Sequence, residues 1–242
     1  MLQEKMPLIS DAKPLSEASR HMSMTQERSK LILIAAMAAG LSYLAADALP
    51  LPAPAAIAWK GAGVALLAIY AASQAHNAEG WLITGVMAFG ALGDVMLEIA
   101  GLIPGALAFL VGHLIAIALY LRNRRAKLSL SQGLLAIVII PATVVTAYLL
   151  PTDRPGAPGV ALYALGLSVM AATAWISRFP RYLVGLGAMM FVASDLLIFA
   201  HSGPLAHASW IGLAIWGLYF AGQTAICWGV TTRLSQPAAD AA

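Results

Sequence analysis

The sequence predicts an all-α membrane protein, a polytopic bundle of about eight transmembrane helices. Of its 242 residues 60% are hydrophobic and only 10% are charged, and the mean hydropathy is +0.80. Soluble domains have about a quarter of their residues charged, so this chain has too few charges to cover a water-facing surface. Apolar runs long enough to cross a bilayer follow one another from Lys30 onward.

Polar segments border the predicted bundle. Residues 1–28 are polar and mixed in charge, which predicts a disordered cytoplasmic tail, with Met22 and Met24 as alternative start sites. Residues 31–230 are expected to form one transmembrane domain, and residues 231–242 a short C-terminal tail. The eight spans are expected at residues 31–49, 54–73, 81–100, 105–121, 131–150, 159–177, 182–200 and 208–230. Their short connections, rich in Gly and Pro, are typical of antiparallel neighbours.

The lysines and arginines predict the orientation. With the N-terminus inside, 12 of the 14 fall in cytoplasmic segments, one (Arg154) falls in an outer loop, and Lys60 lies within a span. Both termini are therefore expected in the cytoplasm, in a protein of the bacterial inner membrane. The first span also resembles a signal peptide, with a basic flank and an "Ala46-Asp47-Ala48" end. Its cleavage would leave seven spans, whereas its apolar length favours retention.

Two similar segments indicate an internal repeat. "FGALGDVML" at residues 89–97 resembles "FVASDLL" at residues 191–197, and a tyrosine follows each aspartate after about one further span, Tyr120 and Tyr219. Spans four apart in the chain share a direction, so the halves would form a parallel repeat of two four-helix units. Because apolar sequences resemble each other easily, coincidence remains the alternative.

Charged side chains interrupt the apolar spans at Lys60, Asp94, Glu98 and Asp195. A charge at the centre of a membrane helix costs about 2.5–3.5 kcal/mol on insertion scales. Such residues either pair with one another to fix helix packing or form a functional site, and intramembrane acids favour the second reading. Glu98 lies near the outer end of its span, where its side chain can reach the interface, so both roles stay open for it.

The predicted depths place three of these residues in one layer. At 1.5 Å per residue, Asp94 and Asp195 lie about 20 Å from the cytoplasmic ends of their spans, and Lys60 lies about 10 Å from the outer end of its own. His113, on the fourth span, falls close to the same layer, either as a packing residue or as a member of the site. We therefore expect the site to open toward the outer half of the membrane, where Asp47 also falls.

Other polar residues carry weaker signals. Tyr219 and Gln223 share a helix face in the inner half, where they either line a polar cavity or tie helices together. His201 and His207 lie in a loop without ligand-like spacing, so no metal site and no cofactor are expected. Cys227 lies in an apolar run, typical of a buried or lipid-facing thiol.

The order of four short motifs resembles a known family. "GD" ends at Asp94 in the third span, "FLVGH" ends at His113 in the fourth, "SD" ends at Asp195 in the seventh, and "YFAGQ" spans 219–223 in the last. Over about residues 31–230, this pattern is similar to the YhhN-type lysoplasmalogenases. The resemblance implies an integral-membrane hydrolase that cleaves the vinyl ether bond of lysoplasmalogens into a fatty aldehyde and a glycerophospho-alcohol.

That reaction fits the intramembrane acids. Protonation of a vinyl ether carbon gives an oxocarbenium-like cation that water captures, which requires a neutral carboxylic acid and a carboxylate. Asp94 and Asp195 are the expected catalytic pair, and Lys60, Glu98 and His113 are expected in substrate binding or support, together with Tyr219 and Gln223. Lys60 either meets the substrate phosphate or pairs with Asp94.

Two other functions stay open at this stage. Intramembrane acids and a parallel repeat also suit a proton-coupled transporter, although Pro141 is the isolated break within the spans. A hydrolase of another ether or ester lysolipid is the second alternative. The expected partners are a lysophospholipid substrate and the lipid bilayer, and no nucleotide loop or basic, aromatic-rich patch indicates a nucleic acid.

Overall fold

The structure, a computed structural model, describes residues 12–236. Over these residues the chain is all-helical, which confirms the predicted fold class. Its elements are α1 (Ala12–Ser42), the 3-10 turn η1 (Tyr43–Ala48), α2 (Ala53–Ser73), α3 (Ala78–Ile99), α4 (Leu102–Arg122), α5 (Leu130–Leu149), α6 (Ala157–Ile176), the π-helical turn η2 (Arg181–Gly185), α7 (Leu186–His201) and α8 (Ile211–Ser235).

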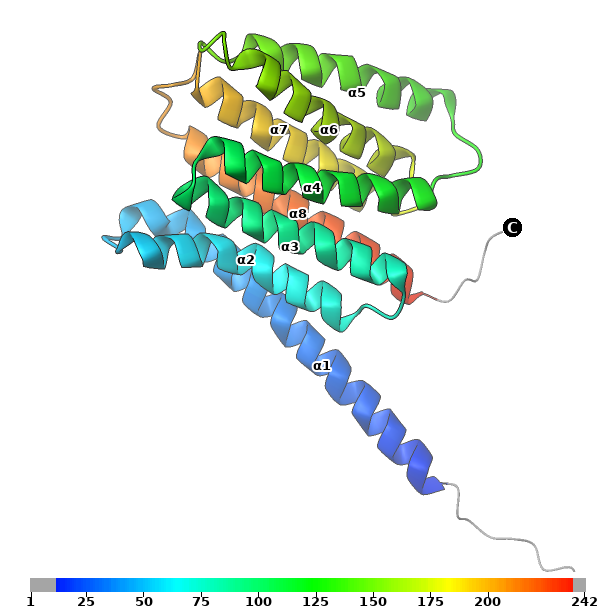
Figure 1. Ribbon diagram of the computed structural model, residues 1–242. Helices are drawn as coiled ribbons and strands as arrows, with labels where there is room; N and C mark the ends of the chain where they lie inside the picture. Colours follow the sequence, from blue (N-terminus) through cyan, green and yellow to red (C-terminus); the bar gives the residue numbers. More distant parts are fainter. Residues whose placement is uncertain (1–11, 237–242) are drawn as a thin grey trace, which may run out of the picture.

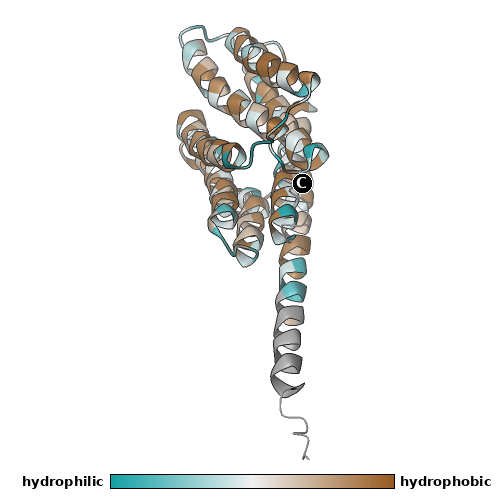
Figure 2. Cartoon of the chain, turned by 90° about the vertical axis from the view of Figure 1, so that its right-hand side faces the viewer, coloured by the Kyte–Doolittle hydropathy of each residue, from teal (hydrophilic) through white to brown (hydrophobic). Residues whose placement is uncertain are grey.

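The described part of the chain has eight helices long and apolar enough to cross a membrane, as predicted. The first candidate span is Gln26–Ala46, which begins within α1 and ends in η1. Hydrophobic residues cover most of the helical surface, and hydrophilic residues gather in the connections and the described N-terminal part of α1 (Figure 2). Large apolar side chains such as Leu130 and Ile137 on α5 are 80% and 69% exposed, which suits contact with lipid.

The two predicted tails differ from the structure in extent. Helix α1 begins at Ala12, so residues 12–28 are helical rather than the disordered tail that we expected, and residues 1–11 lie outside the described residues. Helix α8 likewise continues to Ser235 into the predicted C-terminal tail, of which residues 237–242 lie outside the described residues. The physical reason at the N-terminal side is that nothing breaks the helix there: residues 15–45 contain no Pro or Gly before Gly40.

The helices run back and forth, so both ends of the described chain leave the bundle on the same side (Figure 1). We call the end with the α2–α3, α4–α5 and α6–α7 connections the inner end, following the predicted orientation, and the opposite end the outer end. Consecutive helices pack against each other in α1–α4, α5–α6 and α7–α8. Helix α4 packs against α6, and α8 packs against α2 and α3, which joins the two halves.

The turns follow from local residue chemistry. Asn77 caps α3, since its side chain accepts a hydrogen bond from the Gly80 amide at 2.8 Å. Gly101 has φ 89° in the tight connection from α3 to α4, a conformation that residues with a Cβ rarely adopt. Ser129 and Gln132 form a reciprocal capping box at the start of α5.

Two glycines let α7 and α8 meet backbone to backbone. A Cβ added at Gly187 would lie 2.8 Å from the Gly222 carbonyl oxygen, and one added at Gly222 would lie 2.7 Å from the Gly187 carbonyl oxygen. Small residues at such crossings are typical of membrane helix pairs, where close van der Waals packing stabilises association. This crossing fixes the position of the helix that carries Asp195 against the helix that carries Tyr219.

Helix α1 is joined to α8 through a buried polar contact. The indole Nε1 of Trp216, a buried residue, donates to the Gly40 carbonyl oxygen at 2.7 Å. The ring of Phe220 packs closely on the same glycine, because a Cβ at Gly40 would overlap it. The first helix is therefore packed on the bundle at the level of Trp216, one turn from Tyr219.

The inner end is tied together by polar contacts between two loops. Arg125 donates from Nε to the Ser177 carbonyl oxygen at 2.7 Å, and the Arg178 amide donates to the Asn123 carbonyl oxygen at 2.7 Å. The Asn123 side chain in turn donates to Glu79 at 2.9 Å. These bonds connect the start of α3, the α4–α5 loop and the α6–α7 loop.

The orientation is testable with reporter fusions. Because of the basic-residue bias, fusions placed after Arg125 and after Arg233 should read as cytoplasmic, and a fusion within residues 152–158 should read as external. An intact-mass measurement on the mature protein is the control for cleavage of the first span. Loss of the first 48 residues would replace eight spans by seven.

Candidate active site

Asp94 lies in a buried cluster with side chains of α8. Its carboxyl is 2% exposed, and Tyr219 Oη donates a hydrogen bond to Asp94 Oδ2 at 2.8 Å. Gln223 lies one turn further along α8, and its amide nitrogen and the Tyr219 hydroxyl both lie close to Gly90. Tyr219 directs its hydroxyl hydrogen at Asp94.

Gly90 makes room for this cluster. It lies one turn before Asp94 on α3, and a Cβ at this position would come within 2.8 Å of Gln223 Nε2 and 3.4 Å of Tyr219 Oη. A larger residue would push the tyrosine and the amide away from α3. The glycine therefore sets the close approach of α3 and α8 that brings Tyr219 to Asp94.

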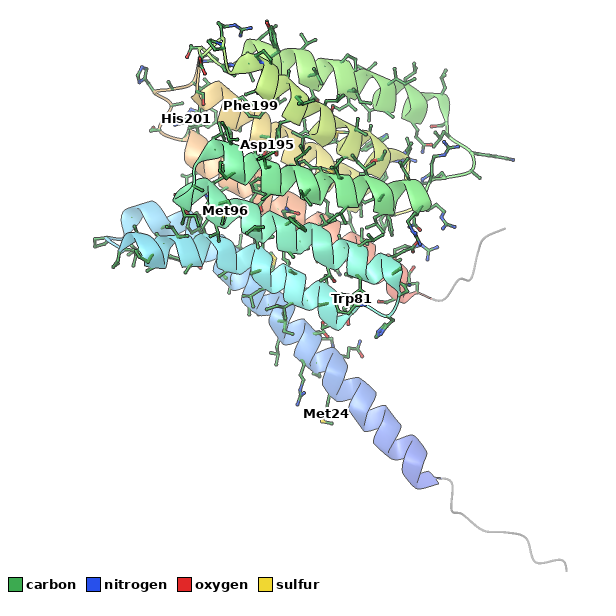
Figure 3. The ribbon with its side chains drawn as sticks, viewed as in Figure 1. Met24, Trp81, Met96, Asp195, Phe199 and His201 are labelled. Carbon is green, nitrogen blue, oxygen red and sulfur yellow. The ribbon has the colours of Figure 1, made fainter. Side chains whose placement is uncertain are left out.

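Asp195 lies in a second buried cluster, with side chains of α6 and α4. Tyr163 Oη donates to Asp195 Oδ2 at 2.6 Å, and His113 Nε2 lies 3.2 Å from the same tyrosine oxygen. Because the single hydroxyl hydrogen of Tyr163 points at Asp195, His113 donates from Nε2. Asp195 lies just on the outer side of the middle of α7, further from the outer end than Phe199 and His201 (Figure 3).

Aromatic rings fill the space between the two clusters. Phe191 lies 5.1 Å from Tyr219 and 5.0 Å from His113, centroid to centroid, so it contacts both clusters. Phe109 lies 5.7 Å from Tyr219 and 5.9 Å from Phe191. These near-perpendicular contacts hold the rings in defined positions and exclude bulk water from the acids.

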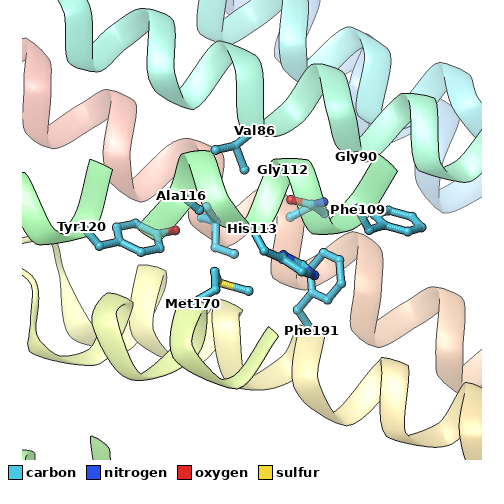
Figure 4. Close-up of a pocket in the computed structure, with 11 residues that line it drawn as sticks. Val86, Gly90, Phe109, Gly112, His113, Ala116, Tyr120, Met170 and Phe191 are labelled. Atoms are coloured by element: carbon cyan, nitrogen blue, oxygen red, sulfur yellow. The ribbon is translucent and has the colours of Figure 1, made fainter. Parts of the chain in front are cut away.

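A small cavity adjoins both clusters. Its volume is about 10 Å³, roughly the room for one water molecule. Helices α3, α4, α6, α7 and α8 contribute to its wall, and Figure 4 shows it beside the rings of His113 and Phe191. The lining residues are Val86, Gly90, Phe109, Gly112, His113, Ala116, Tyr120, Met170, Phe191, Gln223 and Ile226.

Lys60 pairs with Glu98 rather than with Asp94. Its Nζ lies 2.5 Å from Glu98 Oε1, and the two side chains are 18% and 41% exposed, so the pair lies at the surface of the bundle near the outer end of α3. The alternative of a direct pair with Asp94 is therefore wrong. Glu98, one turn after the buried Asp94 on α3, therefore has Lys60 as its partner.

The structure brings together most of the residues that the sequence singled out, with one correction of depth. Asp94, Tyr219 and Gln223 form one cluster, and Asp195 and His113 belong to the other. Tyr219 was expected in the inner half, away from the acids. It contacts Asp94 because α8 begins at Ile211 and extends to Ser235, which shifts Tyr219 toward the outer end of its helix.

Sequence reasoning missed Tyr163 and the two phenylalanines. The available signal for Tyr163 was a hydroxyl within an apolar span, the same signal that drew attention to Tyr219. Instead, the predicted repeat matched Tyr120 with Tyr219. A repeat with matching contacts would pair Asp195 with Tyr120, whereas the structure pairs it with Tyr163 and leaves the Tyr120 hydroxyl without a partner. The repeat remains a prediction, and the polar contacts do not follow it.

The two histidines expected in a loop differ in position: His201 is the last residue of α7, because the helix continues one residue past the predicted span, and His207 lies in the α7–α8 connection. His201 and His207 border an open cavity of about 300 Å³ at the outer end, formed by the α7–α8 connection and the start of α8. Among the described residues, no three His, Cys, Asp or Glu side chains are grouped as metal ligands would be. Cys227 is buried in the core, where its thiol contacts the Leu67 carbonyl oxygen at 3.6 Å.

Comparison with known proteins identifies the family. The model of the YhhN family matches residues 55–230, which include α2 to most of α8 and every residue of the two clusters. No curated protein and no solved structure matches the chain. With the family model covering well over half of its length, the chain belongs to the YhhN family.

Proposed function

We propose that this protein is a membrane hydrolase that cleaves the vinyl ether bond of lysoplasmalogens. The YhhN family includes lysoplasmalogenases. The observation that carries the proposal is the pair of buried carboxyl groups, each held by a tyrosine hydroxyl, on either side of one aromatic cluster and one cavity. An apolar, water-poor site with two carboxyl groups is what vinyl ether hydrolysis requires.

The reaction needs one of the two carboxyl groups as an acid and the other as a base. A neutral carboxylic acid gives its proton to the second carbon of the vinyl group, and the first carbon becomes an oxocarbenium ion. The other carboxylate stabilises this cation and takes a proton from the attacking water, whose oxygen bonds to the first carbon. The resulting hemiacetal then collapses: its hydroxyl gives its proton to the carboxylate that protonated the vinyl carbon, and the aldehyde carbonyl forms. The bond to the glycerol oxygen breaks, and that oxygen takes the proton that the other carboxyl group had received from the water, which restores both groups. The products are a fatty aldehyde and a glycerophospho-alcohol.

The surroundings of the acids support this chemistry. A low-dielectric environment favours the neutral form of one of two neighbouring carboxyl groups, so that one acid and one base coexist at the same pH. The tyrosine hydroxyls fix each carboxyl in one orientation, and the rings of Phe109 and Phe191 present π-faces and edges near a developing cation. The tied loops at the inner end support access for the substrate from the outer half.

The direct test is a panel of lysolipids with aldehyde detection, run on the detergent-purified protein. Aldehyde release from vinyl ether lysolipids, with ester and alkyl ether lysolipids uncleaved, is the expected result. A transporter would release no aldehyde in detergent, because transport needs a sealed vesicle. Cleavage of an ester lysolipid would instead indicate another lysolipid hydrolase.

Asp94→Asn and Asp195→Asn should each lower turnover by at least about 10²-fold, the usual scale for a lost general acid or base. Asparagine keeps the shape and accepts the tyrosine hydrogen bond, yet it neither delivers a carboxyl proton nor stabilises a cation by charge. The double variant should be little worse than either single one, since the two groups act together. Asp153→Asn, in the exposed outer loop, is the matched control. Near-normal turnover in a folded Asp94 or Asp195 variant would refute the two-aspartate mechanism.

Access from the outer half is tested with sealed vesicles. Right-side-out vesicles given external substrate should cleave it faster than inverted ones, when measured before the lipid flips between leaflets. The reason is that the acids, the Lys60–Glu98 pair and the open cavity at the α7–α8 connection all lie toward the outer end. The opposite ranking of rates would place the entrance on the cytoplasmic side.

A role for Lys60 in holding the substrate phosphate is tested by Lys60→Met. KM for lysolipids should rise, while KM for a vinyl ether without a head group should change little, because only the first substrate offers an anion. Glu98→Gln is the control: it frees the lysine from its present partner, so it should leave KM for lysolipids unchanged or lower it. If both variants raise KM equally for both substrates, the ion pair acts only in packing.

A further inference from the structure

Two buried polar atoms face the cavity without a partner. Tyr120 is fully buried and Gln223 is 2% exposed, and neither Tyr120 Oη nor Gln223 Oε1 has a hydrogen-bond partner in the described part of the chain. Both residues line the cavity beside the aspartate clusters. An unpaired buried group costs about 1–3 kcal/mol, so two of them at one cavity indicate that a polar ligand occupies it.

The chemistry of the two atoms specifies that ligand. A tyrosine hydroxyl donates a hydrogen and also accepts one, whereas the free amide oxygen of Gln223 only accepts. A water molecule has the matching chemistry, because its oxygen accepts from a hydroxyl and its hydrogens are donated to an amide oxygen. The volume of about 10 Å³ also suits a single water. In Figure 4 the Tyr120 hydroxyl points along the cavity toward Ala116 and His113.

Residues that line the cavity belong to the clusters of both acids. On one side Gln223 lies beside Tyr219 at Gly90, and Tyr219 donates to Asp94. On the other side His113 bonds to Tyr163, which bonds to Asp195. The cavity is thus bordered by Gln223 from the cluster of Asp94 and by His113 from the cluster of Asp195.

We propose that Tyr120 and Gln223 hold a water molecule in this cavity and that this water captures the oxocarbenium ion. The inference rests on the hydrolase function proposed above and adds two positioning residues to it. In that step the water oxygen bonds to the first carbon of the former vinyl group, one water proton passes to the carboxylate, and no other reactant is needed. Tyr120 and Gln223 act through the water and do not contact the reacting carbon.

A competing nucleophile tests the positioning. Methanol captures the same cation by bonding through its oxygen and losing its proton to the carboxylate, and the product is a mixed acetal that mass spectrometry separates from aldehyde. Tyr120→Phe removes one hydrogen bond to the water and enlarges the cavity. The ratio of acetal to aldehyde should therefore rise about fivefold, the factor that corresponds to about 1 kcal/mol for one hydrogen bond.

The product ratio is insensitive to the amount of folded enzyme and to the rate of the protonation step, so a general loss of structure does not change it. Tyr70→Phe is the matched control, because Tyr70 is also buried but does not line the cavity, and it should keep the wild-type ratio. Ala116→Val fills the cavity without removing a hydroxyl and should raise the ratio as well, which covers the case in which Tyr120→Phe does not fold. A wild-type ratio in both cavity variants would overturn the assignment.

The water site itself is tested without catalysis. An experimental structure at a resolution that shows ordered water should contain one within hydrogen-bond distance of both Tyr120 Oη and Gln223 Oε1, and should lose it in Ala116→Val. An empty or differently filled cavity would overturn the site. Failure of the hydrolase proposal shows instead as the absence of aldehyde from wild type, with the water still present.

Discussion

The rest of the structure depends on the need of two buried carboxyl groups for a hydrogen-bond donor within the bilayer. The hydrocarbon region of a bilayer offers no bulk water to supply one, and an unpaired polar group there costs several kcal/mol, on the order of the lost hydration. Each aspartate meets this need with one tyrosine hydroxyl from another helix. Those two bonds determine that α3 meets α8 and that α6 meets α7 at the level of the acids.

The neighbouring residues follow from that requirement. Gly90 lets α8 approach α3 closely enough for Tyr219 to reach its carboxyl, and the Gly187–Gly222 crossing holds α7 against α8. Aromatic rings then fill the gap between the acids. Lys60 forms an ion pair with Glu98 near the outer end of α3. The direct partner of the buried Asp94 carboxyl is therefore the neutral hydroxyl of Tyr219.

The sequence was sufficient for the class of the fold and for part of the site. Apolar length and basic-residue bias are properties of single segments, so the eight spans could be predicted, and charges in apolar runs are conspicuous, so Asp94, Asp195 and Lys60 could be singled out. The partners of these residues depend on helix rotation and on which distant helices meet, which residue types alone do not fix. For that reason Tyr163 was missed, and the partner of Lys60, Glu98, was not among the two roles expected for the lysine. Helix ends were the other weak point: the start of α8 moved Tyr219 to the level of Asp94, and α1 extended into the expected tail.

The contact between Trp216 and Gly40 makes the first helix part of the support of the site. A chain that lost α1 would leave the indole N–H of a buried tryptophan facing lipid with no acceptor, at a cost of about 1–3 kcal/mol, and would uncover the ring of Phe220 beside it. Trp216 also packs against Tyr219 at 5.6 Å between ring centroids. Release of α1 would therefore loosen the tyrosine that orients Asp94, and so the segment that looks most like a removable leader is mechanically coupled to a proposed catalytic carboxyl.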